Sequence, residues 1–202
     1  PCPEKVVVAS VAGNHIADAI SDAADQLWQL QPEFINSQRS FHGLVNDYAE
    51  PDRLGVDRLL AMLAAYRELG GPVLVIDCGS AVTIDLVGAD GIFLGGVILP
   101  GITLACQSLV AGTVNIDNCL LDGEIDTLAK TTADGVKAGV LTGLAGGIEK
   151  VVSEQLAQSG LTPRIVITGG DANRLANHLS LELISRPDLV LQGLYLAAAE
   201  SD

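Results

Sequence analysis

Three consecutive apolar runs, separated by short glycine turns, constrain the fold of this chain more than any other feature. They lie within VLVIDCGSAVTIDLVGADGIFLGGVILPG, residues 73–101. Short apolar runs rich in β-branched residues and bounded by turn residues are typical of buried strands, so we predict strands over 73–76, 82–87 and 92–98. The first run ends in Asp77, Gly79 and Ser80, not in the Asn-Gly or Asp-Gly of an ordinary hairpin. This pattern indicates a turn that faces a ligand.

Helical and extended patterns surround these strands. We expect strands over 5–10, over 164–170 and near 183. We expect helices over 15–30 and 55–69, then from about 102, 132 and 171, and a last one within RPDLVLQGLYLAAA, while 31–51 and 109–128 look irregular. Because strands joined by hairpins feed into helices, the order does not match the regular alternation of a simple parallel sheet.

Four glycines at intervals of four residues follow one side of the long helix from residue 132. They are Gly135, Gly139, Gly143 and Gly147. Each glycine inside a helix costs about 1 kcal/mol relative to alanine, so the stripe indicates that another helix approaches closely. A contact within the chain and a contact between subunits explain the stripe equally well. Thr131 and Asp134 at the helix start resemble a capping box.

Composition excludes several classes of partner. The 202 residues carry a formal charge of −14, which argues against binding to nucleic acid or to an anionic membrane surface. We expect no signal peptide and no membrane span, because no run of about 18 apolar residues escapes a charge or a turn. The cysteines lack metal-ligand spacing, so we expect them to be apolar filler, without disulfides, in a reducing cytoplasm. Since the chain begins at Pro1 and almost at once enters a strand, we expect the true N-terminus to be missing.

Two glycine turns after apolar strands, at 77–80 and 168–171, could bind a nucleotide, although each alone could be an ordinary turn. No P-loop and no GxGxxG motif is present. Phosphoryl transfer needs a cation, neutralised phosphate charge and a proton acceptor. Asp77 could hold the cation, Ser80 could donate to a phosphate, and Asp57 could accept the hydroxyl proton. Arg58 could pair with an anionic acceptor, but Asp57 and Arg58 could equally be a helix-start acid and a surface ion-pair partner.

Six motifs occur in an order that is similar to one family. They are YAEPDRLGVDR, VIDCGSAVTIDLV, DGIFLGGVILPGITL, TTADGVKAG, VITGGDANRL and PDLVLQGL, between about residues 6 and 196. Together they resemble the type III pantothenate kinases, within the acetate/sugar kinase–Hsp70–actin superfold. The resemblance implies an α/β, actin-like (ribonuclease H-like) two-lobe ATPase fold with an incomplete first lobe. Residues 1–70 would be the remainder of the first lobe with the substrate motif, and 71–202 the second lobe.

The resemblance also implies roles for individual residues. Asp57 would accept the proton of the pantothenate hydroxyl, and Asp77 would bind a monovalent cation, K⁺ or NH₄⁺. Mg²⁺ would arrive with ATP. Thr132 would reach pantothenate across a homodimer interface. The remaining pantothenate residues would be Tyr48, Gly55, Val56 and Arg58, and the ATP residues would be Gly79, Ser80, Gly169 and Gly170.

The implied function is ATP-dependent phosphorylation of pantothenate to 4'-phosphopantothenate, the first step of coenzyme A biosynthesis. Ser80 stands where the family has threonine, a mild change. The family's N-terminal D-x-G-N turn and later lysine, which grip the ATP phosphates, have no counterpart in this sequence. We favour truncation as the reason, and the alternative is a non-catalytic regulatory accessory protein of the same family. A sugar or acetate kinase is a weaker third interpretation, because LGVDR is poorly matched there.

Overall fold

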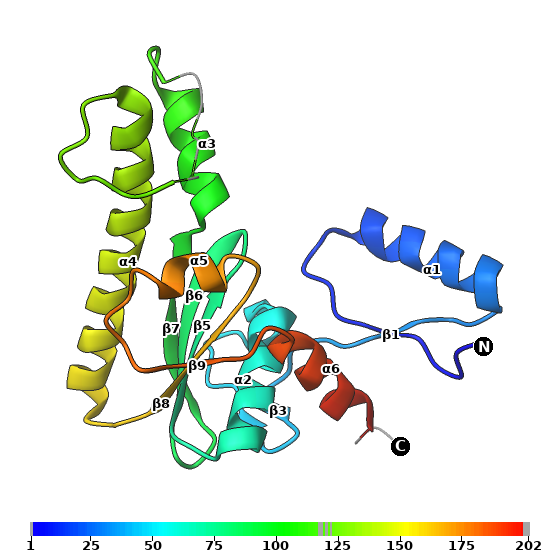
Figure 1. The fold of residues 1–202 in the computed structure, drawn as a ribbon. Helices are drawn as coiled ribbons and strands as arrows, with labels where there is room; N and C mark the ends of the chain where they lie inside the picture. Colours follow the sequence, from blue (N-terminus) through cyan, green and yellow to red (C-terminus); the bar gives the residue numbers. More distant parts are fainter. Residues whose placement is uncertain (1, 117–118, 120, 122, 200–202) are drawn as a thin grey trace.

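A five-stranded sheet forms the centre of the protein. The computed structural model describes residues 2–116, 119, 121 and 123–199 (Figure 1). The strand order is β7-β6-β5-β8-β9. Strands β5 (Val73–Cys78), β6 (Ala81–Val87) and β7 (Phe93–Pro100) form an antiparallel meander, and β8 (Arg164–Thr168) and β9 (Leu183–Ser185) continue the sheet parallel to β5. The three strands predicted from residues 73–101 are therefore confirmed.

Helices cover both faces of this sheet, as the continuous apolar run of its central strand β5 requires. On one face lie α2 (Val56–Leu69) and α6 (Leu189–Ala199), which pack against Val73, Val75 and Val87. On the other face, α4 (Thr132–Ser159) and α5 (Ala172–Ala176) pack against Leu74 and Ile76 among others. Figure 1 shows α4 on one side of the sheet and α2 with α6 on the other.

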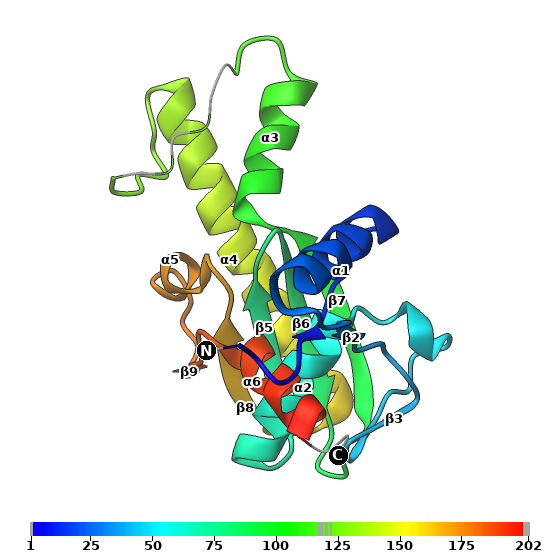
Figure 2. The same ribbon diagram turned by 90° about the vertical axis from the view of Figure 1, so that its right-hand side faces the viewer.

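The N-terminal part projects to one side of this body (Figures 1 and 2). There β1 (Val7–Val8) and β2 (Glu33–Phe34) pair in parallel around α1 (Asn14–Trp28), in which only Ala24 is buried. The sequence predicted the first strand and the helix, although the strand is shorter than expected. A small hairpin, β3 (Ser40–Phe41) with β4 (Leu44–Val45), and a 3₁₀ turn, η1 (Pro51–Arg53), lead to α2 and were not predicted.

The predicted division into residues 1–70 and 71–202 stays a prediction. Helix α2 precedes that boundary, yet it packs on the sheet that follows it and on α6. A Cβ atom at Gly193 of α6 would overlap the carbonyl oxygen of Leu60 in α2, so these two helices are in close contact. None of the helices that the structure describes is both long and apolar enough to cross a membrane.

Helix α3 (Ile102–Gly112) and the first half of α4 extend beyond the sheet as a two-helix arm (Figure 1). Helix α3 takes up the first part of the stretch that the sequence presented as irregular, and positions 117–118, 120 and 122 of that stretch lie outside the described residues. Thr131 caps α4, because its hydroxyl accepts the backbone N–H of Asp134 at 3.2 Å, as the capping-box pattern predicted.

Cys106 of α3 forms a disulfide with Cys119, so the expectation of a chain without disulfides is wrong for this pair. The two cysteines are 13 residues apart in sequence, and the turn after α3 brings them together. Spacing alone could not reveal this pairing, because it depends on where α3 ends. Cys78 is buried and free, as expected of apolar filler, and Cys2 is free and exposed.

Candidate functional site

The two glycine turns predicted to bind nucleotide lie at the same edge of the sheet. They meet because β5 and β8 are parallel neighbours in which Asp77 pairs with Thr168, so both strands end together. The backbone N–H of Asp171 donates to the carbonyl oxygen of Cys78 at 3.0 Å and connects the two turns. Gly169 has a φ of +96°, and a Cβ atom there would lie 2.5 Å from the carbonyl oxygen of Cys78. Only glycine fits this close approach.

A cavity of about 660 Å³ opens between these turns and the start of α3. Gly79, Ser80 and Gly170 line it, so three of the four residues predicted to bind ATP share one cavity. Gly169 does not line the cavity and instead lies against the carboxylate of Asp77. The structure adds residues that the sequence analysis missed, namely Thr103, Leu104 and Gln107 of α3, together with Cys78 and Asp171. The spacing of Thr103 and Gln107, four residues apart on one helix face, was the available signal.

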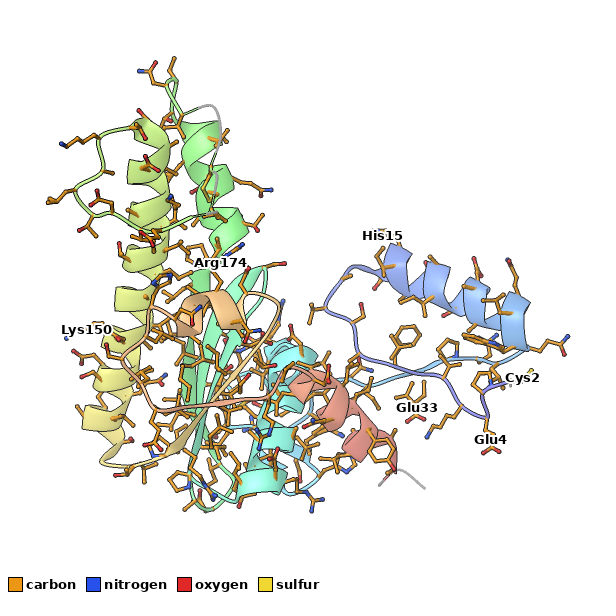
Figure 3. The ribbon with its side chains drawn as sticks, viewed as in Figure 1. Cys2, Glu4, His15, Glu33, Lys150 and Arg174 are labelled. Carbon is orange, nitrogen blue, oxygen red and sulfur yellow. A yellow bond between two sulfur atoms is a disulfide. The ribbon has the colours of Figure 1, made fainter. Side chains whose placement is uncertain are left out.

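The carboxylate of Asp171 lies next to the guanidinium of Arg174. Its Oδ1 atom is 3.6 Å from Nη1 of Arg174, which is labelled on α5 in Figure 3.

A larger cavity of about 870 Å³ lies between the β6–β7 hairpin and the second half of α4. None of the predicted site residues lines that cavity, so we place the candidate site at the glycine turns.

Asp57 lies in the first turn of α2, where the helix dipole favours a negative charge. Its Oδ1 atom accepts the backbone N–H of Arg58 at 2.8 Å. A Cβ atom at Gly55 would lie 2.5 Å from this same oxygen, so the glycine makes room for the carboxylate. The side chain is thereby held at a fixed position at the helix start.

Asp77 is buried within electrostatic reach of two other carboxylates, Asp57 and Asp85. Burial, together with the negative charges of Asp57 and Asp85, raises the pKa of Asp77 to about 6. Asp57 precedes the sheet, whereas Asp77 and Asp85 lie on β5 and β6, so this cluster is a product of the tertiary structure. A cation placed here would relieve the repulsion between the carboxylates.

Arg58 makes a buried ion pair with Asp85. Its Nε donates to Oδ2 at 3.0 Å and its Nη2 to Oδ1 at 2.5 Å, and the two side chains are 7% and 1% exposed. Burial raises the pKa of Asp85, an effect that the hydrogen bonds and charge of Arg58 oppose. Arg58 is therefore no surface ion-pair partner. The sequence analysis missed Asp85, although a charged residue within a buried strand is itself a signal.

The remaining predicted acceptor residues lie in different places. Tyr48 stacks on Phe93, with ring centroids 6.2 Å apart, and both rings lie about 6 Å from the guanidinium of Arg58. The side chain of Val56 is buried in the core beneath α2. Thr132 lies at the start of α4, in a separate groove that does not include Asp57. Within one chain, Thr132 is thus not part of the Asp57 site.

The glycine stripe forms one wall of that groove, which is also lined by Leu99 of β7 and by Ala105 and Leu109 of α3. Cβ atoms built at Gly135, Gly139 and Gly143 would meet nothing within 4 Å. The alternative of a tight contact within the chain is therefore excluded at these three positions, among the residues that the structure describes. A contact with another molecule stays open.

Comparisons with known proteins point to one family. The family model of type III pantothenate kinases matches residues 1–154. A type III pantothenate kinase from Nitrosococcus oceani is 34% identical over 202 residues, a match that covers 98% of this chain and 76% of the relative.

Solved structures give the same picture of the fold. A Campylobacter jejuni protein described as a Baf family transcriptional activator has a TM-score of 0.61 and 25% identity, and the match covers 98% of this chain and 84% of that one. A protein from Sinorhizobium meliloti described as a 2-dehydro-3-deoxygalactonokinase has a TM-score of 0.54 and 18% identity. The match covers 85% of this chain and 65% of the Sinorhizobium meliloti chain. At this level of identity, it supports only the fold, which is that of the actin-like ATPases.

Proposed function

Because the chain belongs to the type III pantothenate kinase family, whose enzymes use ATP to phosphorylate pantothenate in coenzyme A biosynthesis, we propose that its reaction takes place where Asp57, Asp77 and the two glycine turns meet. The observation that carries this proposal is the position of Asp77 next to the turn that lines the cavity, with the negative charge of Asp57 close enough to raise the pKa of Asp77. Phosphoryl transfer depends on positioning and on charge stabilisation, and this arrangement can supply both.

Asp57 is the proposed proton acceptor for the primary hydroxyl of pantothenate. One of its oxygens is engaged by the backbone N–H of Arg58, so the carboxylate is oriented and its other oxygen can accept a hydroxyl proton.

The nucleotide is proposed to bind in the cavity of the glycine turns. Gly79 and Gly170 allow its phosphates to approach the backbone closely, and the hydroxyl of Ser80 can donate to a phosphate oxygen. Gly169 is proposed to act by setting the path of the second turn against Asp77.

Asp77 is the proposed ligand of a monovalent cation, K⁺ or NH₄⁺. The described residues contain no group of three or more His, Cys, Asp or Glu side chains arranged to hold a metal. A single carboxylate with backbone oxygens suits a monovalent ion, whereas Mg²⁺ is commonly bound through ATP phosphates and one or two carboxylates. Such cations would supply neutralisation of phosphate and carboxylate charge.

The acceptor is proposed to lie beside Tyr48, Gly55, Val56 and Arg58, with the backbone of Gly55 and Val56 as its contact because the Val56 side chain is buried. Thr132 could join them only from a second subunit. The open groove along the glycine stripe supports a homodimer, since it is apolar and none of the residues that the structure describes fills it.

A coupled ADP-release assay tests this function. We expect release that depends on pantothenate and is faster with K⁺ than with Na⁺ alone. Asp57→Asn should lower kcat by about 10²–10⁴-fold while pantothenate still binds in calorimetry. Asp52→Asn, an exposed acid in the preceding turn, is the matched control and should keep full activity. Unchanged turnover in Asp57→Asn would show that the base is assigned wrongly, and absence of release from the unaltered protein would overturn the function.

A further inference from the structure

Asp85 occupies a position that the proposed chemistry leaves unexplained. It lies in β6, opposite Val75 of β5 and Gly96 of β7, and it is 1% exposed. Both of its oxygens accept from Arg58, at 3.0 Å from Nε and at 2.5 Å from Nη2. A buried ion pair contributes little to net stability compared with apolar packing, so its presence calls for another explanation.

The sheet is shaped to admit this pair. A Cβ atom at Gly96 would lie within van der Waals overlap of Oδ1 of Asp85 and 2.7 Å from Nη2 of Arg58. Three elements, α2, β6 and β7, therefore meet at one guanidinium. Glycine at position 96 provides the space that any other residue would fill.

Two aromatic rings also contact the guanidinium. The rings of Tyr48 and Phe93 have their centroids 6.0 and 5.9 Å from Cζ of Arg58, within the range of cation–π attraction. A guanidinium has five N–H donors, and Asp85 takes one from Nε and one from Nη2. The side chain of Tyr48 also hydrogen-bonds to the guanidinium, so two of the five donors are left, and these can meet a carboxylate.

We propose that Asp85 is a positioning residue that turns these donors of Arg58 toward the carboxylate of the acceptor, an inference that rests on the proposed function. Asp85 does not touch the acceptor. Since it already neutralises Arg58, the recognition of an anionic acceptor depends on the direction of the N–H donors and not on net charge. If the orientation of Arg58 matters, removing the charge of Asp85 should weaken binding of an anionic acceptor. If net charge matters, the same change should strengthen that binding.

The test compares pantothenate with pantothenol, its neutral analogue in which an alcohol replaces the carboxylate. In Asp85→Asn, Arg58 keeps its charge but loses one of the two oxygens of residue 85 that accept from it, so its orientation relaxes. We expect KM and the calorimetric Kd for pantothenate to rise about tenfold, while KM for ATP and for pantothenol change less than twofold. Gly96→Ala should give the same pattern, because it displaces the Asp85 carboxylate without changing any charge.

The matched control is the second Arg–carboxylate pair of α2. Glu68 accepts from Nε of Arg186 at 2.9 Å, and both side chains are about one-third exposed. Glu68→Gln should lower Tm slightly and leave the preference for pantothenate over pantothenol unchanged. If Asp85→Asn binds pantothenate more tightly, or weakens ATP and pantothenate equally, the positioning role is overturned.

A measurement on the unaltered protein covers the case in which these variants do not fold. The ¹⁵N signals of the Arg58 guanidinium should shift on addition of pantothenate and stay in place with pantothenol. Identical shifts with both compounds would overturn the inference. Absence of pantothenate binding and of pantothenate-dependent ADP release would instead overturn the proposed function, so the two failures are distinguishable.

Discussion

Gly169 lies directly against the carboxylate of Asp77, so that a Cβ atom at position 169 would be 2.5 Å from Oδ1 of Asp77. The contact joins the turn after β8 to the end of β5. The proposed cation ligand and the proposed nucleotide turn are therefore one structural unit. A substitution at either residue should change the position of the other.

Gly169→Ala should destabilise the protein and weaken nucleotide binding. The φ of +96° strains any side chain, and the new methyl group would displace Asp77 and the Cys78 carbonyl. We expect a loss of roughly 1–3 kcal/mol in the free energy of unfolding, measured by urea denaturation. Gly170→Ala is the control for stability, because a Cβ atom there meets nothing within 4 Å. Equal losses in the two variants would contradict the contact.

Asp77 should make stability depend on pH in a defined window. The folded protein holds this proton up to about pH 6, whereas the ordinary value is 3.8, so the folded state binds more protons between these values. The contribution of Asp77 to stability therefore falls as pH rises from about 4 to about 6, by an amount on the order of 1–2 kcal/mol once solvent screening is allowed for.

Asp77→Asn removes this titration. Its Tm relative to the unaltered protein should increase from pH 4 to pH 7 in a buffer without potassium or nucleotide, as measured by differential scanning fluorimetry. Potassium should raise the Tm of the unaltered protein at pH 7 and leave that of the variant unchanged. A Tm difference that is constant over this pH range would contradict the raised pKa.

A substitution in the glycine stripe should separate the proposed dimer. Gly139→Gln places a side chain in the groove beside α3 and should give monomers in analytical ultracentrifugation. Gly146→Gln is the matched control, since Gly146 is also an exposed position of α4 with open space around it but does not line the groove. Both variants gain similar helix propensity, so a difference in assembly reports on the groove. Dimers in both variants would exclude this face.

Reduction of the disulfide between Cys106 and Cys119 should lower stability. Opening a loop of this length costs about 3 kcal/mol in the chain-entropy estimate. We expect dithiothreitol to lower the Tm of the unaltered protein and to have no effect on the double variant Cys106→Ser, Cys119→Ser. Intact-mass measurement before and after reduction and alkylation checks that the bond is present. Equal Tm values with and without reductant would contradict a stabilising role.

Local pattern was sufficient to predict most of the scaffold. The three strands from 73 to 101, helix α2 and the capped start of α4 follow from apolar periodicity and from turn and cap residues, all of which act over a few neighbours. The short strands β2, β3 and β4 were not predictable in this way, because two-residue strands depend on the segments with which they pair.

The candidate site likewise has residues that local sequence identifies and pairs that only the tertiary structure brings together. Asp57, Asp77 and the glycine turns could be selected from the sequence, because their positions at strand ends and at a helix start have a local physical reason. The ion pair of Arg58 with Asp85 and the disulfide of Cys106 with Cys119 join residues that are distant in sequence, and only the tertiary structure decided them. The sequence alone established which groups the chain carries, whereas packing determined which of these groups face each other, because burial and pairing depend on neighbours that only the folded chain provides.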